Sequence, residues 1–245
     1  MEELLRVEDL RVSYPGFELN DISFTCHKGE FIGVIGVNGA GKSTTIKAIM
    51  QMIARDNGNI YWKSEKVTEK KVVAFRECIG YVGDNDCYYP NIKVGKILRF
   101  VSALYSNWDY EMMEKYLCIF NLDTNKKMKE LSTGMRVKLD LLMAMSHNAE
   151  LYILDEPTSG LDPLVRKEVI DVLHDLVKRE GKTVILSSHI TSDLEKTADR
   201  ILYLVDGTVV VDNGVKQIRS DFAETLSKVP EDVLLEDVLF HLMTR

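Results

Sequence analysis

The sequence has few of the features that mark membrane-spanning, secreted or nucleic-acid-binding proteins. Its 245 residues contain no apolar run close to the roughly 20 residues of a membrane span. The N-terminal stretch Met1–Arg6 is acidic and lacks the apolar segment of a signal peptide. The net charge of −7 argues against the clustered basic surface that nucleic acid requires, so we expect no nucleic-acid partner.

Cysteine is also scarce. The four cysteines (Cys26, Cys78, Cys87 and Cys118) form no C-x-x-C pair and have no histidine at metal-ligand spacing. We therefore expect reduced, mostly packed thiols in a cytosolic protein.

Linkers rich in Pro or Ser, repeats and low-complexity tracts are absent as well. The length suits one large α/β domain, or a core with a modest insertion.

The most informative segment present is a glycine-rich loop. It reads Gly36-Val37-Asn38-Gly39-Ala40-Gly41-Lys42-Ser43-Thr44, after the apolar run Phe31–Ile35 and before a predicted helix over Thr44–Met52. The loop fits G-x-x-x-x-G-K-[ST], and a strand before it with a helix after it is the context of a phosphate-binding loop. Backbone N–H groups would hold a polyphosphate, Lys42 would reach the β- and γ-phosphates, and the Ser43 hydroxyl would hold Mg²⁺. The segment predicts nucleoside triphosphate binding.

Two further apolar runs predict buried strands of a parallel sheet covered on both faces. Leu151–Leu154 ends in Asp155 and Glu156, and Thr183–Ser188 ends in His189. Ligands of open α/β sheets bind at the carboxyl ends of the strands, which directs both carboxylates toward the phosphate loop. Asp155 would support Mg²⁺, directly or through water, and Glu156 can activate a hydrolytic water. The alternative is a solvated acidic turn.

Local signals predict the remaining elements. Strands are expected over 4–14 and 19–25, and a helix is expected to begin with Asp162 as N-cap and Pro163 and to end before Gly181. Ser192 and Glu195 have the spacing of a capping box. A hairpin is expected around Asp206-Gly207, and a small helix over 236–242. The stretch from about 85 to 149 is helical in pattern and is interpreted as an insertion on the α/β core.

Several motifs together resemble the ABC ATPase family over nearly the whole chain. Leu131-Ser132-Thr133-Gly134-Met135 resembles the Leu-Ser-Gly-Gly-Gln signature, and Ser159-Gly160-Leu161-Asp162 resembles the D-loop. His189 stands where that family has its switch histidine, and Tyr14 where it has the aromatic residue that stacks on adenine. Each motif alone is weak, but their order and spacing are those of the family.

The resemblance implies a fold and a division of the chain. The fold would be an α/β P-loop NTPase (RecA-like) core with an N-terminal antiparallel β-subdomain and an inserted all-helical subdomain. The core would cover about 1–84 and 150–215, the helical subdomain about 85–149, and a C-terminal tail 216–245.

The resemblance also implies a mechanism in which two ATPase domains enclose two ATP molecules with Mg²⁺. Ser132 and Gly134 of one protomer would face the γ-phosphate held by the phosphate loop of the other. Glu156 would be the general base, and His189 would contact the γ-phosphate and sense its loss. The implied ATP-binding residues are Tyr14, Gly36, Asn38, Gly39, Ala40, Gly41, Lys42, Ser43, Thr44, Ser132 and Gly134, and the implied metal ligands are Ser43, Asp155 and Asp84.

The sequence departs from the family pattern in two places. Asp84 stands where the family's Q-loop has glutamine, with Asn85 as the alternative if the alignment slips by one residue. An ionised Asp84 beside the γ-phosphate would be tolerated through Mg²⁺, by protonation or by turning away, and our hypothesis is that it binds the metal through water. Thr133 and Met135 replace Gly and Gln of the signature, and Thr133 would be strained if this position needs positive φ.

These features predict the ATP-hydrolysing subunit of an ABC transporter, in the pattern of exporters of peptides, antibiotics or lipids. Its partners would be a separate transmembrane subunit, contacted around Asp84–Lys96, and a second ATPase subunit, either identical or a paralogue. It would lie in the cytoplasm, peripheral on the inner face of the cell membrane. The alternative is a soluble ABC-type ATPase that acts as an assembly scaffold. A nucleotide kinase or GTPase would leave the Leu131 and Ser159 motifs unexplained.

Overall fold

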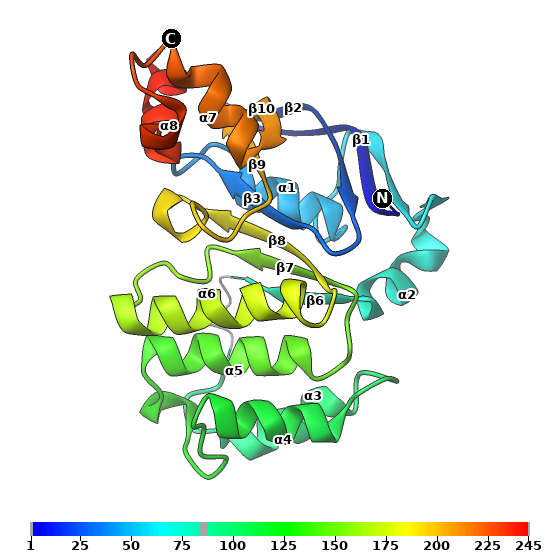
Figure 1. Cartoon of the computed structure of the whole chain (residues 1–245). Helices are drawn as coiled ribbons and strands as arrows, with labels where there is room; N and C mark the ends of the chain where they lie inside the picture. Colours follow the sequence, from blue (N-terminus) through cyan, green and yellow to red (C-terminus); the bar gives the residue numbers. More distant parts are fainter. Residues whose placement is uncertain (1, 84–87, 245) are drawn as a thin grey trace.

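The computed structural model describes residues 2–83 and 88–244, which form a layered α/β molecule (Figure 1). A four-stranded sheet has the order β2-β1-β4-β5, and a six-stranded sheet has the order β10-β9-β3-β8-β7-β6. The strands are β1 (Glu3–Tyr14), β2 (Phe17–His27), β3 (Phe31–Ile35), β4 (Asn57–Trp62), β5 (Glu65–Lys66), β6 (Ile79–Val82), β7 (Leu151–Asp155), β8 (Thr183–Ser188), β9 (Arg200–Val205) and β10 (Thr208–Gly214).

The helices cover the sheets and fill the segment between β6 and β7. They are α1 (Lys42–Ile49), α2 (Val72–Glu77), α3 (Val94–Ser102), α4 (Tyr110–Ile119), α5 (Thr133–Met145), α6 (Pro163–Lys178), α7 (Val215–Ala223) and α8 (Leu235–Met243). Short 3₁₀ turns are η1 (Glu69–Lys71), η2 (Met128–Glu130), η3 (Thr191–Asp193) and η4 (Pro230–Asp232). Within the described ranges no helix is both long enough and apolar enough to cross a membrane.

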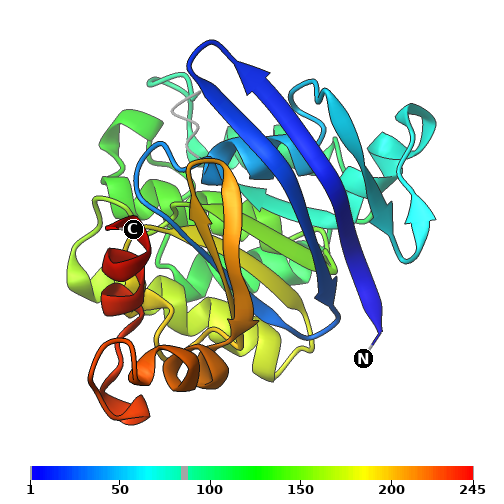
Figure 2. The same ribbon diagram turned by 90° about the horizontal axis from the view of Figure 1, so that it is seen from above.

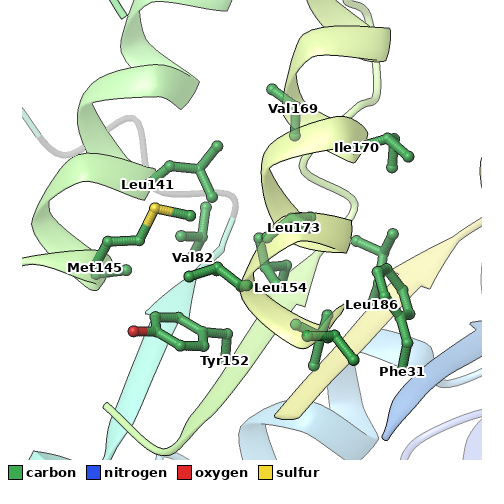
Figure 3. Close-up of a cluster of buried hydrophobic side chains, with 14 of the residues drawn as sticks. Phe31, Val82, Leu141, Met145, Tyr152, Leu154, Val169, Ile170, Leu173 and Leu186 are labelled. Carbon is green, nitrogen blue, oxygen red and sulfur yellow. The ribbon is translucent and has the colours of Figure 1, made fainter. Parts of the chain in front are cut away.

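The six-stranded sheet is parallel except for β10, which runs antiparallel to β9. The central strands β3, β7 and β8 are buried at every residue because both faces are covered there. One face packs on α5 and α6 through a cluster that includes Tyr152, Leu154 and Leu186 (Figure 3). The opposite face packs on α1 and the N-terminal sheet, which lies across it (Figure 2). The predicted parallel sheet with two covered faces is confirmed.

Local predictions are largely confirmed. The Asp162 side chain accepts from the N–H groups of Leu164 and Val165 and caps α6, which has Pro163 in its first position. β9 and β10 form the expected hairpin around residues 206–207. The helices α3, α4 and α5 lie in the segment predicted to be helical. The boundaries of the three predicted parts of the chain stay a prediction.

Two local predictions are wrong. The helix after the phosphate loop begins at Lys42 and ends at Ile49 rather than at Met52, and Gln51 has a φ of 53°. Ser192 and Glu195 form no capping box, because residues 191–193 make a 3₁₀ turn instead of an α-helix. The Glu195 carboxylate instead accepts from the Leu235 N–H and pairs with Arg219. A tertiary contact with the C-terminal segment thus replaces the local cap.

Candidate active site

The phosphate loop connects β3 to α1, and its lysine, Lys42, is hydrogen-bonded to backbone carbonyl groups of the same loop. Lys42 Nζ donates to the carbonyl oxygens of Gly36 at 2.7 Å and Val37 at 3.2 Å. Gly41 precedes α1 with a φ of 107°, and a Cβ there would lie 2.6 Å from a methyl group of Leu19. This position therefore requires glycine for both its backbone and its packing.

A cleft of about 500 Å³ opens over this loop. It is lined by Gly16, Phe17, Asn38, Gly39, Gly41, Lys42, Ser43, Thr44 and Glu156. Gly36 and Ala40 do not line it and are buried. The backbone N–H groups at the start of α1 have the position that favours a bound anion. Most of the predicted ATP-binding residues of the loop are thus in one cleft.

The strand β7 ends with the two acidic residues in different environments. Asp155 is 4% exposed, and its Oδ1 accepts a 2.7 Å hydrogen bond from Ser187 Oγ. Glu156 follows with a φ of 51°, in the left-handed region that is uncommon for residues other than glycine. Its N–H donates to Ser187 Oγ at 3.0 Å and to the Ser187 carbonyl oxygen at 3.2 Å. Ser187 was not predicted as a site residue.

Glu156 connects the phosphate loop with the end of β8. Its Oε1 lies 3.0 Å from Lys42 Nζ, and its Oε2 lies 2.7 Å from His189 Nδ1. The side chain of Glu156 is 19% exposed, so water screens these interactions only in part. The structure therefore brings together the three residues predicted to be catalytic.

A second cleft of about 400 Å³ lies beside the first and contains the oxygen donors predicted for Mg²⁺. Ser43 and Asp155 both line it, with Glu156, Ser159 and His189. Hydroxyl and carboxylate oxygens suit Mg²⁺, which usually keeps several waters and binds one or two carboxylates plus substrate phosphates. The described residues contain no cluster of three or more His, Cys, Asp or Glu that could hold a metal by themselves. Asp84 lies outside the described residues.

Thr158 and Asp193 connect the segments that follow Glu156 and His189. Thr158 Oγ1 donates a 2.8 Å hydrogen bond to Asp193 Oδ2, and both residues are buried. Burial raises the pKa of the Asp193 carboxyl above its ordinary value. The segments that follow Glu156 and His189 are thus held to one another.

The signature residues stand at the N-terminus of α5. Ser132 is exposed and caps α5 by accepting from the Met135 N–H. Neither Ser132 nor Gly134 lines either of the two clefts, whereas Thr133 lines the second. Thr133 is the first residue of α5 and has no positive φ, so the strain expected at this position is absent.

Tyr14 stands at the end of β1, paired in register with Phe17 across the turn, and is 47% exposed. Gly16 and Phe17 line the loop cleft, but Tyr14 does not. The structure therefore places the predicted adenine-stacking residue at the edge of the cleft rather than in its wall. Phe17 was missed because Tyr14 alone matched the family pattern.

Comparison with known proteins agrees with this arrangement. A sequence profile described as "ABC transporter" matches residues 19–159. The chain belongs to the ABC transporter family. Its relatives include two Bacillus subtilis (strain 168) proteins, the ABC transporter ATP-binding protein YtrB and the uncharacterized ABC transporter ATP-binding protein YhcH. YtrB is 27% identical, with 89% of this chain and 74% of YtrB covered, and YhcH is 32% identical, with 92% and 74% covered.

Among solved structures, one described as the ATP binding subunit of an ABC transporter superposes with a TM-score of 0.85. It is 28% identical, and the superposition covers 99% of this chain and 100% of that one. The fold is that of ABC ATPase cassettes, and the resemblance seen in the motifs is confirmed. This family member is an ATP-binding, ATP-hydrolysing subunit.

Proposed function

We propose that this ATPase uses Mg²⁺-ATP to drive a membrane-embedded export partner and that Glu156 is its general base. The chain of contacts from Lys42 through Glu156 to His189 is the observation that carries the proposal. It joins the phosphate loop, the end of β7 and the end of β8 around one carboxylate.

The catalytic roles follow from the position of each group. Lys42 would move from its carbonyl partners to the phosphates and neutralise their charge. The Glu156 carboxylate would accept the proton of the attacking water, a contribution worth about 10²–10⁴ in rate. His189, hydrogen-bonded to the same carboxylate, would hold it in place and contact the γ-phosphate.

Mg²⁺ would be held by the Ser43 hydroxyl and, directly or through water, by Asp155. When bound, the metal would neutralise charge on the phosphate oxygens. A role for Asp84 in this site stays a prediction.

We propose further that two ATPase subunits enclose ATP between them. Ser132 and Gly134 stand at the N-terminus of α5, where unpaired N–H groups and the helix dipole favour an anion. Both lie outside the clefts around their own phosphate loop. The anion-favouring end of α5 supports binding of the γ-phosphate of a facing subunit, either a second copy or a paralogue.

The contact with the transmembrane subunit is proposed on the helical segment after residue 87. A groove of about 720 Å³ there is lined by Tyr89, Lys93, Lys96 and Arg99, among others, and Tyr89 is 81% exposed. The described residues place no carboxylate within 4.0 Å of any of these three cations. The groove therefore suits a segment that carries carboxylates beside an apolar side chain.

The segment 124–129 adds three lysines to the positive charge of the groove. It runs antiparallel to 90–95, with hydrogen bonds from the Val94 N–H to the Lys126 carbonyl and from the Met128 N–H to the Ile92 carbonyl, both 3.0 Å long. Lys126, Lys127 and Lys129 are exposed on it. We name the groove together with these lysines the basic groove.

Export is proposed from the relatives. They include ATP-binding proteins named for bacitracin transport in Bacillus licheniformis, lantibiotic transport in Streptococcus pyogenes and fluoroquinolone export in Mycobacterium tuberculosis. The chain would then act in the cytoplasm, on the inner face of the cell membrane. The alternative of a soluble assembly ATPase predicts no membrane partner for the basic groove.

The test is ATP-dependent dimerisation of the Glu156→Gln variant, followed by size-exclusion chromatography, with Lys42→Ala as control. We expect a dimer that requires both ATP and Lys42. A monomer that nevertheless binds ATP would contradict the proposal that two copies of this chain pair. Full ATPase activity of Glu156→Gln would contradict the proposed base.

A further inference from the structure

Ser187 is a fully buried hydroxyl that none of the roles above uses. It lies on β8 and is the register partner of Asp155 on β7. Its Oγ donates to Asp155 Oδ1 at 2.7 Å and accepts the Glu156 N–H at 3.0 Å. A single hydroxyl therefore connects the proposed metal ligand with the backbone of the proposed base.

The backbone of Glu156 depends on this contact. A non-glycine residue with a φ of 51° is held in a sparsely populated conformation, which persists where surrounding contacts determine it. The contacts of the Glu156 N–H are both with Ser187, through Oγ at 3.0 Å and through the carbonyl oxygen at 3.2 Å. Removing Oγ leaves only the longer of the two.

The Asp155 carboxylate depends on it as well. Asp155 is 4% exposed, so water reaches it poorly. The Ser187 hydroxyl donates to one oxygen of this carboxylate, Oδ1, and so restrains the rotation of the side chain. Groups that hydrogen-bond a metal ligand in this way typically change metal affinity or activity by 10–100-fold, to order of magnitude, when they are mutated.

We infer that Ser187 is a positioning residue for ATP hydrolysis, which sets the direction of the Glu156 side chain and the orientation of the Asp155 carboxylate. The inference rests on the proposed roles of these two acidic residues. Ser187 itself would touch neither ATP nor the attacking water. Its effect would appear in the hydrolysis step and in the metal interaction rather than in binding of the nucleotide.

Thr183 provides a matched control at the opposite end of the same strand. It is also fully buried, and its Oγ1 also accepts a backbone N–H, that of Gly29, at 3.0 Å. Thr183→Val and Ser187→Ala each remove one buried hydroxyl from β8. Only the second removes contacts with Asp155 and Glu156.

The experiment measures kcat and KM for ATP of the full chain, and Mn²⁺ affinity with a non-hydrolysable ATP analogue by electron paramagnetic resonance. For Ser187→Ala we expect kcat and Mn²⁺ affinity each to fall by about 10–100-fold, with KM within about twofold of wild type because the phosphate loop is unchanged. Thr183→Val should keep both kcat and Mn²⁺ affinity near wild type, even if its melting temperature falls.

The inference is overturned if Ser187→Ala keeps its kcat, if the loss appears only in KM, or if Thr183→Val loses the same activity. Glu156→Gln, measured in parallel, separates this failure from failure of the proposed function. An inactive Glu156→Gln with an active Ser187→Ala would reject the role of Ser187 alone. An active Glu156→Gln would reject the proposed base.

Discussion

Lys42 Nζ and Glu156 Oε1 lie 3.0 Å apart and form an ion pair between the phosphate loop and the end of β7. Their side chains are 5% and 19% exposed. The same ammonium group is the one that would contact the β- and γ-phosphates of ATP. Glu156 and the phosphates therefore compete for one cation, and ATP binding would release the carboxylate for catalysis.

This competition predicts that Glu156→Gln binds ATP more tightly than the wild type. Loss of a competing ion pair worth about 1 kcal/mol would raise affinity by about fivefold. The measurement is isothermal titration with ATP, in EDTA to prevent hydrolysis. Glu150→Gln is the control, because it breaks the 2.7 Å ion pair with Lys63 and Glu150 lines neither cleft. Unchanged or weaker binding by Glu156→Gln would show that the ion pair does not oppose ATP.

Close packing of α5 against α6 leaves no room for a side chain at Gly134. A Cβ added there would lie 2.8 Å from Cγ1 of Val165, so α5 and α6 would have to move apart. Gly134→Ala should lower the free energy of unfolding by about 1–3 kcal/mol, measured by urea denaturation. Gly214→Ala is the control, because a Cβ there meets nothing closer than 3.6 Å. Equal stability of the two variants would contradict the close contact with α6.

The strand ends that form the site could be predicted, because a continuous apolar run followed by Asp155-Glu156 or by His189 has few other interpretations. Ser187 could not, because its role depends on the register of β7 against β8 and on the direction of one hydroxyl. The spacing of Ser192 and Glu195 wrongly predicted a capping box, also because a contact distant in sequence decided the structure. A local capping signal competed with a partner 40 residues away, Leu235, and the distant contact prevailed.

His147 predicts a pH dependence of stability. It is buried, stacks on Tyr105 at 4.1 Å between ring centroids, and has its Nε2 3.0 Å from the Ile79 carbonyl oxygen. Burial lowers the pKa of the imidazole below its ordinary value, despite hydrogen bonds to backbone carbonyls that favour the charged form.

Because the folded pKa is below the unfolded one, the contribution of His147 is fully present above the unfolded value of about 6.5 and is lost as pH falls through the folded pKa. His147→Gln, which cannot gain a proton there, should lose less stability between about pH 7 and pH 5. Melting temperatures across this range give the test. Parallel pH profiles of the two proteins would exclude His147 as a source of acid sensitivity.

Charge reversal in the basic groove should weaken binding of the membrane subunit without lowering the ATPase rate. Lys93 and Lys96 are exposed in the groove and line neither of the two clefts. The double variant Lys93→Glu/Lys96→Glu should therefore keep the ATPase rate of the isolated chain. It should lose most of its co-purification with a tagged membrane subunit expressed beside it, because two attractive charges become repulsive.

The control for the basic groove is Lys66→Glu/Lys70→Glu, which reverses two exposed charges near β5 and changes the net charge by the same amount. We expect this control to co-purify like the wild type. Raising the salt concentration should weaken the wild-type complex, since the screening length for exposed charges falls from about 10 Å at 0.1 M to about 3 Å at 1 M. If both double variants bind the membrane subunit equally well, the groove is not its docking surface. If only the groove variant fails to bind the membrane subunit, the partner segment carries the complementary carboxylates. Charge-swap variants of the membrane subunit that restore binding then identify their positions.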